Sequence, residues 1–137
     1  MAVSTLTARL PYQAETVWAV VTNLADTAWR SDLRRVEVLS PAVFVEHDTG
    51  GHATRFTITA AQPPCLWAFA MESENFSGQW TGQFQPVPGG VRLTFTEAVT
   101  PKRRWLALLL PAYLRRQQRR YLADLRRELA RRAGGQP

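Results

Sequence analysis

Glu97 is the residue of this sequence whose setting best suits acid–base chemistry. It follows Val91, Leu93 and Phe95 in an alternating run, so the two-residue repeat of a strand puts its carboxylate on their apolar face. Apolar surroundings raise the pKa of a carboxyl group, which could then serve as a general base or anchor a ligand hydroxyl. Alternatively, the carboxylate could have a structural role and form an ion pair with an arginine of the last predicted helix, residues 102–133, at the mouth of a cavity.

Two histidines form a second candidate site. His47 and His52 flank the glycines at 50–51 and could face each other across a hairpin, as in a metal or acid–base site. No third ligand is near, because alternation should direct Glu46 and Asp48 to the outer face. Solvated hairpin histidines are therefore the favoured interpretation, and we expect neither a metal nor a cofactor.

Strand alternation also predicts an inner face rich in aromatic side chains. Gly78 and Gly82 share that face with Trp80 and leave space for a ligand or another ring. Tyr113 and Gln117 lie one helical turn apart, and either could hydrogen-bond a bound molecule. The same side chains could simply fill a core. The predicted ligand-binding residues are Trp29, Phe56, Ile58, Trp67, Phe69, Met71, Trp80, Phe84, Leu93, Phe95, Glu97, Leu110, Tyr113, Leu114 and Gln117.

The elements that position these residues follow from hydrophobic periodicity. Residues 3–10 alternate as a strand, helical spacing covers about 14–23 and then 26–33, and residues 35–99 predict six strands. Residues 102–133 predict a long amphipathic helix, kinked by Pro111 and ended by Gly134 and Gly135. The strand breaks fall at residues 40–41, 48–51, 62–64, 73–75 and 88–90.

This order predicts an α+β, helix-grip fold: a seven-stranded curved antiparallel sheet, two short helices and one long C-terminal helix (β-α-α-β6-α). It resembles the START-like (SRPBCC) superfamily of polyketide cyclases, dehydrases and lipid-transfer domains. Residues 14–23 look like that superfamily's first helix, and Trp29 with residues 32–38 looks like its second helix entering the second strand. The resemblance covers essentially all of residues 1–137 as one domain and implies a pocket between sheet and helix.

Composition excludes several classes of protein. The single cysteine, Cys65, rules out an intramolecular disulfide and a multi-thiolate zinc site, and we expect it to be buried in a reducing, cytoplasmic protein. No secretory leader is recognisable, and the longest apolar run, residues 105–114, is too short to span a membrane. We expect a monomer or homodimer.

The positive charge is concentrated near the C-terminus. Residues 102–132 carry eleven basic and two acidic side chains, a net +9, so the remainder holds −3 of the total of +6. This helix could face solvent or attract an anionic membrane, since the apolar run 105–110 lies between basic residues. Nucleic acid is disfavoured, because only Tyr121 adds an aromatic ring among these arginines.

Three functions remain open. The favoured one is binding or carriage of a small hydrophobic molecule, such as a lipid, polyketide or other aromatic or isoprenoid compound, in a cavity between sheet and helix. The alternatives are a cyclase- or dehydrase-like enzyme that uses Glu97 as acid or base, and a peripheral lipid or quinone chaperone that meets the membrane through its basic helix. Binding is favoured over catalysis because it requires only a cavity.

Overall fold

One antiparallel sheet packs against one long helix in the computed structural model, which describes residues 1–134. The elements in chain order are β1 (Ala2–Leu10), α1 (Ala14–Thr22), β2 (Leu33–Ser40), β3 (Val43–Asp48), β4 (Ala53–Gln62), β5 (Leu66–Ser73), β6 (Phe76–Val87), β7 (Gly90–Pro101) and α2 (Leu106–Gly134). The predicted helix-grip architecture is confirmed. Gly135, predicted to end the last helix with Gly134, lies outside the described residues.

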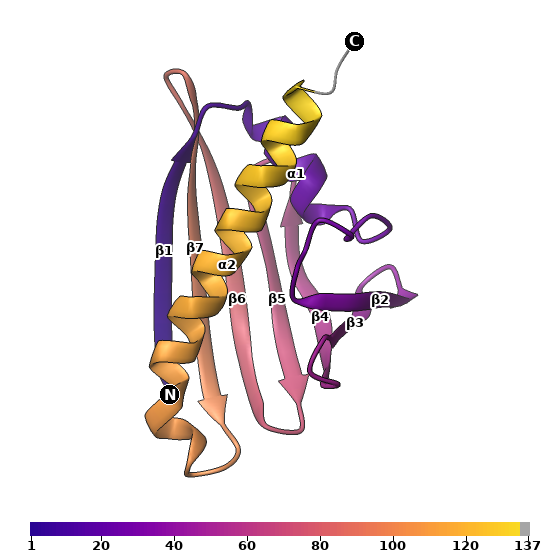
Figure 1. Ribbon diagram of the computed structural model, residues 1–137, viewed down its shortest axis with the longest axis vertical. Coiled ribbons are helices and arrows are strands. Elements are labelled where there is room, and N and C mark those ends of the chain that lie inside the picture. The colour runs from indigo at the N-terminus through magenta and orange to yellow at the C-terminus, as the bar shows by residue number, and fades with distance from the viewer. Residues whose placement is uncertain (135–137) are drawn as a thin grey trace.

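The sheet is a meander from β2 to β7 with the first strand added at its end. Its order is β1-β7-β6-β5-β4-β3-β2, and all neighbours are antiparallel. The strands from β2 to β7 are joined at the five turns that the proline and glycine signals predict. Figure 1 shows α2 crossing one face of the sheet diagonally, while β2 lies across the direction of β6 and β7. The sheet therefore curves around the helix.

The side chains facing α2 are those that strand alternation predicts. On β4 to β7 the inner face holds the buried residues Phe56, Trp67, Phe69, Met71, Trp80, Phe84, Val91, Leu93 and Phe95. Gly82 lies under the Trp80 indole, so a Cβ atom at position 82 would clash with that ring. The sequence left open whether a ligand or another ring would occupy the space at Gly82. In the structure the Trp80 ring occupies it.

Buried polar groups fasten α2 to the rest of the fold. The Ser4 hydroxyl donates to Gln118 Oε1 at 2.7 Å, and Gln118 Nε2 donates back to the Ser4 carbonyl at 2.9 Å. Further along the helix, Asp124 accepts bonds from the backbone N–H and the hydroxyl of Ser31, both at 2.8 Å. Ser4, Gln118 and Asp124 are buried and all find partners, so these bonds fix the helix relative to β1 and to the segment between α1 and β2.

Three local predictions are wrong. Residues 26–33 form turns rather than a second short helix, because Trp29 enters the core and Ser31 bonds to α2 instead of to a helical neighbour. Cys65 is exposed in the turn between β4 and β5, since its backbone closes the turn through a 2.7 Å bond to Gln62. The last helix also begins four residues later than predicted, at Leu106.

Candidate functional site

A cavity of about 780 Å³ lies between the sheet and α2. Its lining comes from strands β3 to β7, from the segment between α1 and β2, and from the inner side of α2. Pockets that hold small molecules typically enclose roughly 300–1,000 Å³, so this space is large enough for a ligand. The curved sheet and the helix thus leave an unfilled volume that the side chains facing it do not close.

Stacked aromatic rings form the floor of the cavity. The rings of Phe69 and Trp80 are parallel, with centroids 4.8 Å apart, and Trp80 meets Phe95 at 5.0 Å. Trp67 packs edge-on against both Phe69 and Trp80, at 5.3 and 6.0 Å. Rings held by several neighbours keep their positions, so they offer a rigid apolar surface.

Most of the predicted ligand-binding residues border this cavity. Those that do are Trp29, Phe56, Trp67, Phe69, Met71, Trp80, Phe95, Glu97, Leu110, Tyr113, Leu114 and Gln117. The other three, Ile58, Phe84 and Leu93, are not part of its lining. Phe84 instead packs against Trp18 of α1, with ring centroids 5.2 Å apart. Alternation assigned these three to the inner face, but it does not distinguish a cavity wall from the core beneath a helix.

A charged cluster lies on the side of the cavity nearest β3. Arg30 donates to both oxygens of Asp32, at 3.1 and 2.9 Å, and to both oxygens of Glu46, at 3.2 and 3.4 Å. Its guanidinium also stacks on the ring of Tyr121, 4.9 Å from the centroid. Burial opposes this charge, but the carboxylates of Glu46 and Asp32 outweigh it and raise the pKa of Arg30 above its usual value.

The prediction that Glu46 and Asp48 point outward is therefore wrong. Both residues line the cavity, together with Arg30, and they share the strand face of buried Phe44. The apolar run at 42–45 has no alternation from which the inner face of β3 could be read, so sequence reasoning assigned the wrong parity. Arg30 was not predicted as a site residue, because its partner Glu46 is sixteen residues away in the chain and no local pattern links the two.

Glu97 faces the cavity from the predicted inner side of the sheet, but it does not form the ion pair that was the structural alternative. Within residues 1–134 its carboxylate has no hydrogen-bond or salt-bridge partner, either on α2 or elsewhere. Burial, reinforced by the negative charge of Glu46 and only partly offset by Arg30, raises the pKa of Glu97 from 4.5 to about 7. A carboxyl group that titrates near neutrality can accept or donate a hydrogen bond toward a molecule in the cavity.

Other polar groups reach the cavity from α2. Tyr113 and Gln117 border it from the helix, and burial raises the pKa of the Tyr113 hydroxyl. The indole N–H of Trp29 is buried and has no acceptor among the described residues, so it does not face the cavity. Tyr113 and Gln117 therefore add neutral donors and acceptors on the helix side of the cavity.

The two histidines do not form a joint site. His47 is opposite Ala53 in the β3–β4 register and lies 3.3 Å from Glu37, whereas His52 borders the cavity beside Asp48. No cluster of three or more histidine, cysteine or acidic side chains suited to a metal occurs within residues 1–134.

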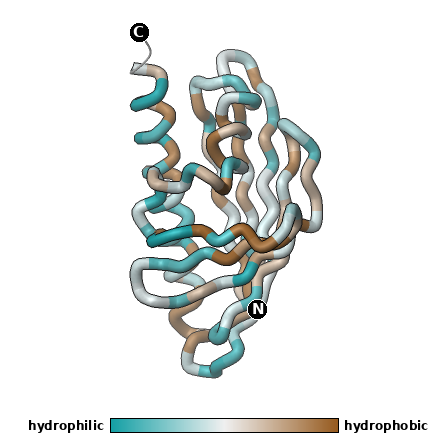
Figure 2. The backbone as a smooth tube through the Cα atoms, turned by 90° about the vertical axis from the view of Figure 1, so that its right-hand side faces the viewer, coloured by the Kyte–Doolittle hydropathy of each residue, from teal (hydrophilic) through white to brown (hydrophobic). Residues whose placement is uncertain are grey.

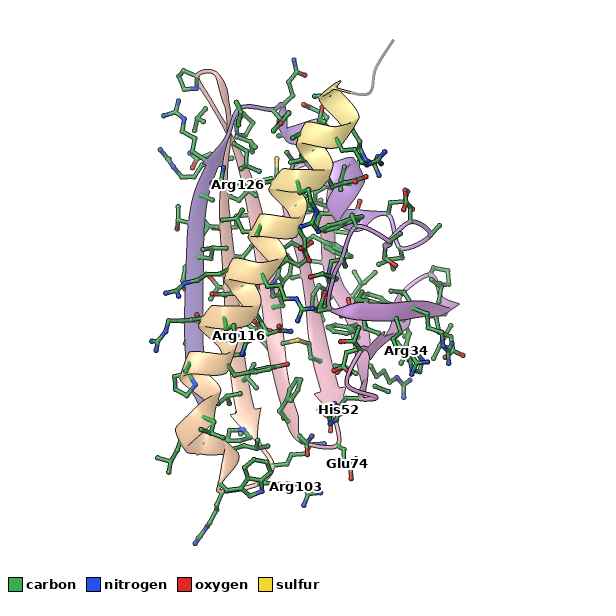
Figure 3. The ribbon with its side chains drawn as sticks, in the orientation of Figure 1. Arg34, His52, Glu74, Arg103, Arg116 and Arg126 are labelled. Atoms are coloured by element: carbon green, nitrogen blue, oxygen red, sulfur yellow. The ribbon has the colours of Figure 1, made fainter. Side chains whose placement is uncertain are left out.

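The cavity opens at the end of the molecule where α2 begins. Figure 3 shows His52 and Glu74 at this end, with Arg103 beside the start of the helix. Trp105 and Leu109 border the cavity here while remaining mostly exposed. The sequence marked residues 105–110 as unusually apolar, but their position at a cavity mouth depends on the fold.

The structure search finds the same fold in proteins of remote sequence. A START superfamily protein from Mycobacterium smegmatis aligns with a TM-score of 0.86 at 12% identity, over 96% of this chain and 99% of that one. A conserved protein from Geobacillus kaustophilus gives 0.83 at 12% identity, over 94% and 95%. A protein from Rhizobium leguminosarum gives 0.70 at 20% identity, over 95% of each chain.

Sequence comparison gives the family. No curated protein matches the sequence. Residues 1–130 match the family described as "Polyketide cyclase / dehydrase and lipid transport", which is nearly the whole chain. Together with the START-like architecture, this match shows that the chain belongs to the polyketide cyclase/dehydrase and lipid transport family.

Proposed function

We propose that this protein binds a small, mainly apolar molecule in the cavity between the sheet and α2, as a carrier or sensor. The observation that supports the proposal is the unfilled volume of about 780 Å³ over a floor of stacked aromatic rings. Enclosing an apolar molecule there would remove its surface from water, which contributes roughly 25 cal/mol per Å² buried. Binding is proposed rather than turnover because Glu97 has no hydrogen-bonded partner in residues 1–134 to complete a catalytic pair.

The experiment is a cavity-blocking substitution combined with ligand detection. Gln117 borders the cavity and makes no side-chain hydrogen bond within residues 1–134, so Gln117→Trp should fill the space without leaving a partner unpaired. Gln79→Trp, on an exposed position of β6, is the matched control.

Native mass spectrometry should show a retained compound on the wild type and on the control, and none on Gln117→Trp. Added apolar compounds should raise the melting temperature of the first two proteins only, because a ligand stabilises the state that binds it. The proposal fails if a broad panel of sterols, fatty acids, fatty alcohols, quinones and aromatic polyketides leaves the wild-type melting curve unchanged and nothing copurifies.

A second candidate function, delivery or collection of the ligand at an anionic membrane surface, is favoured by the start of α2. Trp105, Leu108 and Leu109 are 62%, 89% and 59% exposed, and Figure 2 shows this stretch as hydrophobic. The exposed arginines Arg104 and Arg116 flank it without an ion pair in the described chain. Apolar side chains between free cations suit the interface of an anionic bilayer. Neither helix of residues 1–134 combines the length and apolarity needed to cross a bilayer.

Vesicle sedimentation tests this second function. The protein should sediment with vesicles of phosphatidylcholine and phosphatidylserine but not with phosphatidylcholine alone, and Leu108→Ser should weaken this binding. Leu108 does not border the cavity, so ligand binding in solution should persist. Leu39→Ser, at a 53% exposed position on edge strand β2, is the control and should still sediment. Equal loss in both variants would mean that docking is not localised to α2.

A further inference from the structure

The charge of the cavity is opposite in sign to that of the protein. The chain carries a net charge of +6, yet acidic residues predominate in the lining of the cavity. Within the described residues, Arg30 is the only arginine that borders the cavity. Those acidic residues are Asp32, Glu46, Asp48, Glu74 and Glu97. The arginines of α2 do not border the cavity, because its inner side carries Leu110, Leu114 and Gln118 instead.

The single arginine is not available to an anionic ligand. All three guanidinium nitrogens of Arg30 already donate to Asp32 or Glu46, and Tyr121 covers one face of the group. A ligand carboxylate could recruit Arg30 only by displacing one of these partners, which would leave a buried carboxylate uncompensated. Arg30, Asp32 and Glu46 together carry a net negative charge, so they repel an anion.

Glu97 also borders the cavity but, unlike Asp32 and Glu46, it is not paired with Arg30. Its carboxylate faces the cavity from β7 with no protein donor among residues 1–134, next to the apolar rings of Trp80 and Phe95. Glu97 is partly buried, and an ionised carboxylate that is poorly solvated and has no protein donor is costly, so a ligand that donates a hydrogen bond to it would relieve that cost. A ligand carboxylate in the same place would add a second negative charge in a poorly solvated site.

Building on the proposed function, we propose that the ligand is an apolar molecule with a hydrogen-bond-donating, non-anionic head group, a hydroxyl or an amine, which bonds to Glu97, and that the cavity rejects the corresponding carboxylates. Free fatty acids and acidic polyketides are then excluded, whereas alcohols, phenols and lipophilic amines are accepted. The selectivity comes from the acidic lining, and the aromatic floor accommodates the apolar body in each case.

Three probes with the same ten-carbon tail test this proposal: 1-decanol, decylamine and decanoate, titrated below their aggregation concentrations at pH 8. The net charge of +6 would by itself attract decanoate, so a preference against it must arise inside the cavity. Gln117→Trp is measured with all three probes, and binding that survives this substitution is subtracted as binding outside the cavity.

We expect decanol and decylamine to bind at least about tenfold more tightly than decanoate, since one uncompensated like charge in a buried site costs more than 1.4 kcal/mol. Glu97→Gln should weaken the binding of decylamine and strengthen the binding of decanoate, so the difference between their affinities should become smaller. Decanoate binding as tightly as decanol in the wild type, through the site that Gln117→Trp blocks, would overturn the inference but leave the proposed function intact. If none of the probes and none of the broader panel binds, both fail together.

Discussion

At the scale of single residues, Glu97 should make the protein less stable at alkaline pH. Its pKa is about 7 in the folded protein against 4.5 in the unfolded chain, because of burial and the nearby charge of Glu46. The folded state therefore holds the proton more tightly, and stability present below pH 4.5 is lost as the pH rises to 7. Glu97→Gln cannot ionise, so we expect it to exceed the wild type by about 2 kcal/mol in unfolding free energy at pH 8 and to match it near pH 4.5.

Urea unfolding at the two pH values measures this difference. Glu74→Gln is the control, because it removes one carboxylate from a position exposed to solvent. It should leave the pH dependence of stability unchanged. A Glu97→Gln protein that is less stable than the wild type at pH 8 would show that the ionised carboxylate has a stabilising partner.

The single residues also show how far sequence alone could describe the site. Glu97 was placed on the inner face because Phe95 and Leu93 precede it in an unambiguous alternation, and the structure confirms that position. Its lack of an ion pair was not foreseen, since partners across the cavity depend on tertiary packing. The same limit applies to Arg30 and Glu46, which meet only when the turn before β2 folds against β3.

At the scale of elements, Asp124 should control how firmly the turn before β2 is attached to α2. Burial opposes ionisation of this carboxyl group, but the bonds from Ser31 and Arg127 outweigh it and lower the pKa of Asp124. Asp124→Ala leaves two Ser31 donors without their acceptor, so we expect a loss of about 2–3 kcal/mol in unfolding free energy. Ligand affinity should fall too, because Arg30 adjoins Ser31 and borders the cavity.

Denaturant unfolding and a ligand titration on the same variant test both effects. Arg126→Ala is the matched control: Arg126 is exposed on α2 (Figure 3) and makes no ion pair within residues 1–134. It should change stability by less than about 0.5 kcal/mol. If Asp124→Ala is equally mild, the turn before β2 is held mainly by the burial of Trp29 and by the bonds from Arg120 and Arg127 to the carbonyls of Ser31 and Trp29, rather than by Asp124.

The turn before β2 also explains why the strands were predicted correctly whereas the second short helix was not. The strands and hairpins of residues 35–101 follow from local rules, because alternation and turn residues act over a few positions. Residues 26–33 carry a helical spacing of Trp29 and Leu33, yet their backbone bonds to α2, about ninety residues further along the chain. Local periodicity is overridden here by this long-range hydrogen bond and by the burial of Trp29, so the second short helix does not form.

At the scale of the whole molecule, charge and polarity are divided between two surfaces. The cavity is acidic and aromatic, whereas the outer side of α2 is basic and its first turns expose apolar side chains. Trp105 and Leu109 belong to both surfaces, since they border the cavity and also face solvent. A protein docked through these residues would open its cavity toward the lipid, so the two proposed activities would be coupled by geometry.

Tryptophan fluorescence can separate those activities. Trp105 is 62% exposed, whereas Trp29, Trp67 and Trp80 are buried around the cavity. Anionic vesicles should shift the wild-type emission to shorter wavelength by moving Trp105 out of water, and Trp105→Phe should lose this shift while it still binds vesicles through the remaining apolar and basic residues. A cavity ligand should change the emission of both proteins, because the three buried indoles remain. A vesicle-induced shift that persists in Trp105→Phe would place the membrane contact elsewhere on the molecule.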